Sequence, residues 1–184
     1  MANELIGEVL GTALLVLLGN GVVAGVVLDK SKAKDAGWIV ITIGWGLAVA
    51  MAAFVSGLLG PAHLNPAVSI AMAFAGNLPW GSLVPYILAQ FIGAFIGSII
   101  VFLMYKDHYD ATEDTAAVLA TFSTGPAIRN LVSNTISEAI GTFVLVLGLL
   151  AFGQYDFPTG LGTIIVGGLI LSLGVSLGGP TGYA

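Results

Sequence analysis

Two glutamates stand within or beside long apolar stretches of the sequence, where an ionisable side chain is costly. Glu8 lies in the first of these stretches, and Glu138 lies near the start of a later one. A carboxylate in such surroundings can take part in a proton relay, or it can accept hydrogen bonds from backbone N–H groups and hold a loop in place. The residue types alone leave both roles open.

One histidine is the other candidate for chemistry. His63 is of a type that binds metal ions or serves as a pH-dependent gate. No second histidine or carboxylate stands at ligand spacing from it, and the chain has no cysteine to supply a thiolate. We therefore expect a hydrogen-bonded histidine, no metal and no cofactor. Because the two glutamates are isolated from any nucleophile, we also expect that the chain is not an enzyme.

His63 belongs to an irregular segment, residues 60–67, that precedes a short apolar run ending near Asn77. Within it, Asn65 is a good helix cap and Pro66 suits a first helical turn. The run that follows is too short to cross a bilayer. Irregular backbone at membrane depth is tolerated only where protein buries it or where it lines a water-filled cavity. The segment therefore predicts a re-entrant half-helix entered from a solvated path.

The composition requires a membrane around these features. Of 184 residues, 57% are hydrophobic and only 8% are charged, against about 25% charged in soluble domains. The mean hydropathy is +1.01. The net charge of −5 sits mostly in loops and indicates no nucleic-acid partner.

Five apolar stretches are long enough to cross a bilayer, since about 20 residues suffice. They run from about 3–28, 38–59, 81–105, 134–152 and 161–177. Small residues such as Gly93 and Gly97 are expected to let these helices approach closely. Polar loops separate the stretches, and the longest covers about 106–132.

The chain has the pattern of an internal duplication. The pattern Glu-x-x-Gly-Thr occurs at residues 8–12 and again at 138–142, each time at the start of an apolar run. We divide residues 1–184, a single transmembrane channel domain, into a first repeat of about 1–105, a connecting loop of about 106–132 and an incomplete second repeat of about 133–184. A unit with three spans must enter the membrane from the opposite side in its second copy.

These motifs resemble those of the major intrinsic protein family of aquaporins and aquaglyceroporins. The resemblance rests on residues 62–68, the Glu-x-x-Gly-Thr repeat and residues 179–184, and it is closest to bacterial glycerol facilitators. It implies an all-α membrane protein, an inverted repeat of six transmembrane helices plus two re-entrant half-helices, here truncated after the fifth helix. The second Asn-Pro-Ala motif, a constriction arginine and the sixth span are expected beyond Ala184.

The same resemblance assigns roles to named residues. It places Asn65, Pro66 and Ala67 at the midpoint of a pore and makes Glu8 and Glu138 structural supports. Backbone carbonyls form an acceptor ladder there, and the ladder residues are Pro61, Ala62, His63 and Leu64. The outer constriction is matched by Trp45, Gly174 and Tyr183. From its position alone, Trp45 is equally well explained as a residue of the interfacial aromatic belt.

Function follows from the constriction. Two aromatics beside a glycine form a wedge for a polyol, whose carbons lie on the rings. Glycine at 174 argues for a glycerol-sized opening, whereas Tyr183, where glycerol facilitators often carry phenylalanine, leaves urea, dihydroxyacetone, undissociated lactic acid and water open as main solutes. We expect passive diffusion of glycerol and other small neutral solutes, with some water, through a homotetramer in a bacterial plasma membrane. An ion-coupled secondary transporter is the alternative from another class.

Two rules predict opposite orientations of the chain in the membrane. All five basic residues fall in the loops after the first and third spans: Lys30, Lys32, Lys34, Lys106 and Arg129. The positive-inside rule places these loops in the cytoplasm. The family resemblance places them outside, with a cytoplasmic N-terminus, and we follow it.

Overall fold

The computed structural model describes residues 1–158 and 160–182, and all regular structure in these ranges is helical. Tyr183, one of the three expected constriction residues, lies outside the described residues. The helices are α1 (Ala2–Val27), α2 (Trp38–Ser56), α3 (Pro66–Phe74), α4 (Trp80–Met104), α5 (Lys106–Ala111), α6 (Thr115–Ala120), α7 (Leu131–Phe152) and α8 (Leu161–Ser176).

The long helices coincide with the expected spans. Within the described ranges, α1, α2, α4 and α7 are long and apolar enough to cross a membrane. The fifth stretch forms α8, which has 16 residues and a length of about 24 Å, so it is shorter than a typical hydrocarbon core. The polar loop expected at 106–132 is more ordered than its composition indicates, because it contains α5 and α6.

Contacts at glycines fix the relative directions of the helices. Gly93 and Gly97 of α4 lie against Val9 and Ala13 of α1 in the same chain order, so these two helices run parallel. Helix α2 runs antiparallel to α1, because Gly19 faces Trp45 and Gly11 faces Ser56.

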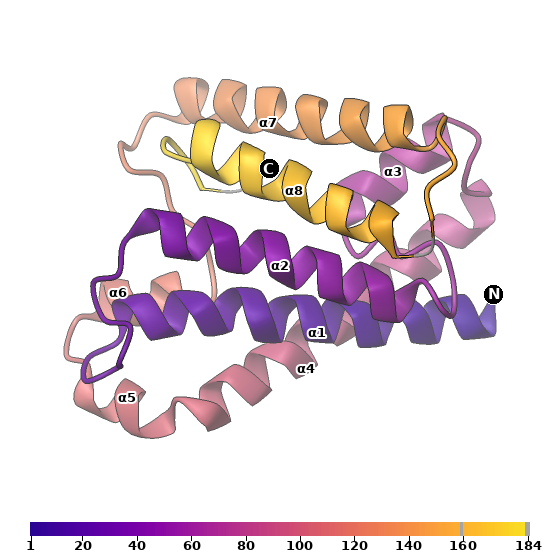
Figure 1. Ribbon diagram of the computed structural model, residues 1–184. Coiled ribbons are helices and arrows are strands. Elements are labelled where there is room, and N and C mark those ends of the chain that lie inside the picture. The colour runs from indigo at the N-terminus through magenta and orange to yellow at the C-terminus, as the bar shows by residue number, and fades with distance from the viewer. Residues whose placement is uncertain (159, 183–184) are drawn as a thin grey trace.

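The order reverses again on the far side of α2. Gly174 lies against Thr42 and Gly167 lies against Ala50, so α8 is antiparallel to α2. Helix α7 is antiparallel to α8 and therefore opposite in direction to α1 (Figure 1). The first helices of the two repeats thus cross in opposite senses, as an inverted repeat requires.

Close packing of helices depends on missing side chains. A Cβ on Gly97 would lie 2.5 Å from the carbonyl oxygen of Ala13, and one on Gly93 would collide with the carbonyl oxygen of Val9. The two glycines therefore allow α4 to approach the backbone of α1, as predicted.

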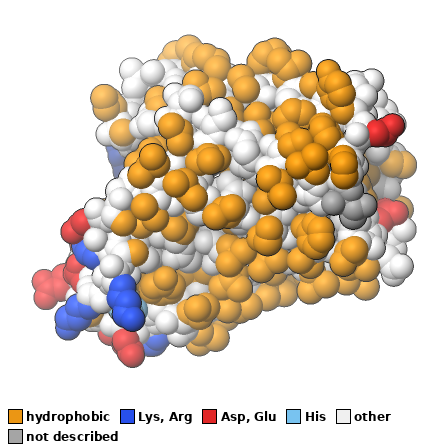
Figure 2. Space-filling model, viewed as in Figure 1, with side chains coloured by type: hydrophobic (Ala, Val, Ile, Leu, Met, Phe, Trp, Pro, Cys, Tyr) orange, Lys and Arg blue, Asp and Glu red, His pale blue; other side chains and the backbone are white. Residues whose placement is uncertain are grey.

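The surface divides into an apolar body and a charged end. Hydrophobic side chains cover most of the face in Figure 2, and Lys, Arg, Asp and Glu gather mainly at the end where Figure 1 shows α5 and the loop between α1 and α2. Large apolar side chains such as Phe91, Phe95 and Leu103 of α4 are more than 60% exposed. Exposed apolar side chains in such number are typical of surfaces that contact lipid or other subunits.

Candidate functional site

The half-helix α3 begins as the sequence predicts. Asn65 has an extended backbone, and its side-chain Oδ1 accepts a hydrogen bond of 2.8 Å from the N–H of Ala67. Pro66 occupies the first turn, where its missing N–H costs nothing. Because Oδ1 is engaged, the side-chain NH₂ of Asn65 remains as a donor. The positive end of the helix dipole lies at the same place.

The approach to α3 has a strained backbone. Ala62 and Leu64 both have positive φ, 55° and 54°, which non-glycine residues rarely adopt. Such residues cost on the order of 1–2 kcal/mol each and persist where their surroundings hold them. Among the described residues, none donates a hydrogen bond to the carbonyls of residues 61–64. Four acceptors in sequence are therefore free for a solute.

Glu8 holds this strained segment from α1. Its Oε1 accepts a 2.7 Å hydrogen bond from the N–H of His63, and its Oε2 accepts one of 2.8 Å from the N–H of Leu64. The carboxylate has no exposed surface. Since the N–H groups of both residues point to Glu8, their peptide groups are fixed, which is the geometry expected of a support.

A second set of polar residues surrounds Glu8 and was not found from the sequence. Gln90 of α4 donates through Nε2 to Glu8 Oε2 at 2.7 Å and to Ser69 Oγ at 2.9 Å. Ser69 in turn lies 3.2 Å from His63 Nδ1. The sequence offers one signal for Gln90. It is the single amide side chain in a 25-residue apolar helix, and such residues often form hydrogen bonds between helices.

His63 takes part in this network. Its ring is half-buried and lies with its centroid 5.3 Å from that of Tyr86, whose hydroxyl donates to Glu4 at 2.9 Å. Within the described residues, no cluster of three His, Cys, Asp or Glu side chains that could hold a metal was found.

A cavity of about 410 Å³ adjoins the segment before α3. A water molecule takes up about 30 Å³ of liquid, so the space admits a small organic solute. Its lining includes residues 61–65 and Thr163 together with apolar side chains such as Leu145, Leu149, Phe152 and Phe157. The cavity lining thus combines residues whose carbonyls have no donor with a largely apolar surface.

Two of the expected constriction residues lie away from this cavity. The ring of Trp45 lies over Gly19 of α1 and packs with Val23, Val26 and Ile41. Gly174 is buried against Thr42, where a Cβ would lie 2.8 Å from Thr42 Cγ2.

The carbonyl of Gly174 also accepts a 2.9 Å hydrogen bond from Trp38 Nε1. Trp45 of α2 therefore contacts α1, whereas Gly174 of α8 contacts Thr42 of α2. Gly174 serves the packing of α2 on α8 in addition to any role in a constriction.

Glu138 occupies the place in the second repeat that Glu8 occupies in the first. It is half-buried and lines a cavity of about 10 Å³, near the volume needed for one water, together with Gly178, Thr181 and Gly182. Each glutamate thus lies beside the glycine- and proline-containing segment that follows the second helix of its repeat.

Helices long enough to span a membrane in an inverted arrangement, with a half-helix beside a cavity, place the chain in the class of integral membrane transport proteins. The model of the major intrinsic protein family matches residues 1–184. The chain belongs to this family, as predicted.

Known relatives are similar to this chain along its whole length. It is 65% identical over 184 residues to a glycerol uptake facilitator protein of Streptococcus pneumoniae, covering 100% of this chain and 79% of the relative. It is 56% identical to glycerol uptake facilitator protein 3 of Lactiplantibacillus plantarum, with coverage of 100% and 77%. The X-ray structure of the aquaglyceroporin from Plasmodium falciparum superposes with a TM-score of 0.86 at 32% identity, covering 99% of this chain and 75% of that one.

Proposed function

We propose that this multi-pass membrane protein is a passive channel through which glycerol and other small neutral solutes, with some water, diffuse down their gradients. The observation that carries the proposal is the row of carbonyls at residues 61–64 that accept no hydrogen bond from the described residues, next to the Asn65 amide, in the lining of a largely apolar cavity. Relatives named as glycerol uptake facilitators support the choice of solute.

The geometry supplies what a polyol loses when it leaves water. Hydroxyl groups donate to the carbonyls of residues 61–64, and the Asn65 side-chain NH₂ donates back to a hydroxyl oxygen. The cavity lining also includes Leu149, Phe152 and Phe157, which the carbon atoms of the solute would contact. A cation gains nothing from the positive end of α3, so the same site disfavours it. No covalent step is required.

Selectivity is proposed to arise at a constriction formed by Trp45, Gly174 and Tyr183. Trp45 comes from α2 and Gly174 from the neighbouring helix α8, and the proposal of a neck rests on their match to the constriction positions of the family. Gly174 adds no side chain to that neck, and its missing Cβ also lets α8 pack on Thr42 of α2. Glu8 and Glu138 are proposed as supports of the two segments that lead to the half-helices.

The proposed domain organisation and oligomeric state are those of the family. We assign residues 1–184 to one channel domain, with a first repeat of about 1–105, a connection of about 106–132 and a second repeat from about 133. The exposed apolar faces of α4 and α7 are available to lipid and to neighbouring copies in a homotetramer of a bacterial plasma membrane.

The solute range is tested by osmotic shrinkage of proteoliposomes that contain the full-length protein. Glycerol, urea, lactic acid below its pKa, dihydroxyacetone and sorbitol are compared in stopped flow. We expect glycerol to enter fastest and sorbitol to be excluded. Undissociated lactic acid or urea entering faster than glycerol would contradict the assignment of the main solute.

A further inference from the structure

The connection between α4 and α7 is ordered and packs against other parts of the chain. This connecting segment, residues 105–130, contains α5 and α6 and touches three other parts of the chain. Its contacts are spaced along its length, from the loop after α1 to the residues just before Tyr183.

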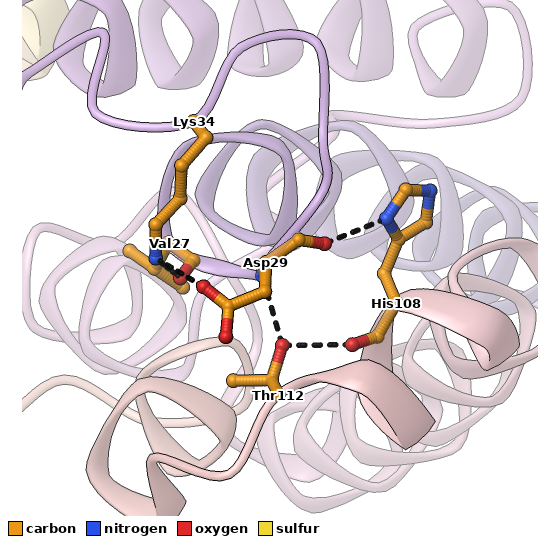
Figure 3. A network of polar contacts seen from close by, with 5 residues as sticks. All are labelled: Val27, Asp29, Lys34, His108 and Thr112. Carbon is orange, nitrogen blue, oxygen red and sulfur yellow. Dashed lines mark hydrogen bonds and ion pairs between the residues drawn. The ribbon is translucent and has the colours of Figure 1, made fainter.

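The first contact joins the connecting segment to the loop between α1 and α2 (Figure 3). The N–H of Asp29 donates to Thr112 Oγ1 at 2.8 Å, and this hydroxyl donates to the carbonyl of His108 at 2.7 Å. His108 Nδ1 lies 2.9 Å from the carbonyl of Asp29, which can only accept, so Nδ1 carries the proton. Lys34 Nζ donates a hydrogen bond to the carbonyl of Val27 and forms an ion pair with Asp29. Both interactions lie within the loop after α1.

The second contact is a buried anchor on α1. Tyr109 packs with Ala24, Leu28 and Val101. Its hydroxyl lies 2.8 Å from Thr121 Oγ1, and the proton of Thr121 goes to the carbonyl of Val118. Tyr109 is therefore the donor of the pair. Burial raises the pKa of Tyr109, so the phenol keeps this proton over the physiological range.

The third contact reaches residues 178–182, the segment that leads to Tyr183. Thr124 Oγ1 donates to the carbonyl of Thr181 at 2.7 Å, and the N–H of Ala127 donates to the carbonyl of Pro180 at 2.9 Å. Gly182 has φ 111°, and a Cβ there would collide with Thr124 Oγ1. The hydroxyl thus lies directly against the backbone of the segment.

We propose that the connecting segment is a strap, anchored on α1 by Tyr109, that holds residues 178–182 in place, and that Thr124 is the positioning residue through which it sets the width of the solute entrance. The inference rests on the proposed constriction, because its effect on selectivity passes through Tyr183. Glu8 holds the segment before α3 by two N–H groups, and the strap holds the corresponding segment of the second repeat by two carbonyls.

The test measures a permeability ratio, which loss of folded protein does not change because both solutes use the same channels. We compare glycerol with the five-carbon polyol ribitol in proteoliposomes. Thr124→Val removes the hydroxyl at nearly constant shape. A lost hydrogen bond of ~1 kcal/mol corresponds to about a fivefold shift in the positioned population, so we expect the glycerol-to-ribitol ratio to fall about fivefold.

Matched variants control for the substitution itself. Thr124→Ser keeps the hydroxyl and should keep the wild-type ratio, and so should Ser123→Ala at the exposed neighbouring position. Tyr183→Ala opens the proposed constriction directly and should lower the ratio. If Tyr183→Ala lowers it and Thr124→Val does not, the strap is wrong and the constriction stands. If neither variant changes it, the constriction is wrong and the strap falls with it.

A double variant tests the anchor on α1. Tyr109→Phe removes only the hydroxyl and is expected to lower the ratio in the same direction, whereas Tyr155→Phe, at an exposed tyrosine, should not. Thr124→Val removes one of the two hydrogen bonds to residues 178–182 and leaves that of the Ala127 N–H, so adding Tyr109→Phe should change the ratio by less than Tyr109→Phe does alone. A double variant whose ratio falls by the product of the two single effects would contradict the strap.

Discussion

Glu8 is a carboxylate without exposed surface on a membrane-spanning helix. An unpaired charge in such a place costs several kcal/mol. Three donors meet it, the N–H groups of His63 and Leu64 and the amide of Gln90, and a hydrogen bond to a charged group contributes roughly 1.5–3 kcal/mol. The two quantities are comparable, so the charge is tolerated only while the strained segment keeps its shape. Carboxylate and segment therefore stabilise each other.

Glu8→Gln tests this dependence. The glutamine amide would present N–H groups to at least one of the existing donors, leaving that donor unsatisfied in a buried place. We expect a loss of stability of about 3 kcal/mol and a loss of most glycerol flux per folded channel. Thermal unfolding in detergent and stopped-flow flux measure the two effects. Glu4→Gln is the matched control one turn earlier, half-exposed, and should have a far smaller effect. Equal effects of both variants would argue against a special role for Glu8.

At this scale the sequence was informative where chemistry is local. The cap at Asn65 and the cost of a charge at Glu8 follow from residue type and immediate surroundings. Gln90 and Ser69 could not be assigned, because their contacts join residues 82 and 21 positions apart. Nothing in the spacing along one helix encodes which residue of another helix lies opposite.

Helices approach one another here through glycine. Gly93 and Gly97 lie against backbone carbonyls of α1, which cannot move aside as a flexible side chain can. Gly81 lies in the first turn of the same helix and faces open space. Glycine therefore allows close helix packing at two positions of α4 and has no packing role at a third.

Substitution by alanine distinguishes a packed glycine from an unpacked one. Gly93→Ala should push α4 from α1 and lower the free energy of unfolding by about 1–3 kcal/mol. Gly81→Ala should be neutral or stabilise by up to about 1 kcal/mol, since alanine is the better helix former. Melting temperatures in detergent give the comparison. A Gly93→Ala protein as stable as Gly81→Ala would show that the close approach is dispensable.

Element prediction succeeded for long apolar helices and failed for short polar ones. Hydropathy located the five expected spans and the half-helix because burial in lipid imposes length and composition. Helices α5 and α6, with six residues each, are too short for a periodic pattern and were expected as loop. Their order comes from tertiary contacts such as Tyr109 with Thr121. The contacts of Trp45 with α1 and of Gly174 with α2 likewise depend on packing.

The whole molecule has its charges mainly at one end, in the loops that contain all five basic residues. The positive-inside rule and the family arrangement give opposite orientations for this end. We infer that the family arrangement holds, with the N-terminus in the cytoplasm. The inverted directions of α1 and α7 are compatible with either orientation, because they fix only relative directions.

Orientation is open to direct labelling, since the chain has no cysteine of its own. A membrane-impermeant maleimide added to intact cells should modify Lys32→Cys in the loop after α1. Ala2→Cys at the start of α1 should react only after the cells are opened. The reverse pattern would show that the basic residues determine the topology and that the inferred orientation is wrong.

The central claim, passive conduction of glycerol, is tested most directly by the concentration dependence of glycerol entry into proteoliposomes containing the full-length protein. A channel with a preformed row of acceptors needs no conformational cycle, so the initial rate should rise linearly with the glycerol gradient. It should also be unchanged when Na⁺ or proton gradients are imposed or collapsed. A rate that saturates at low concentration, or that follows an imposed ion gradient, would contradict the channel and support an ion-coupled transporter.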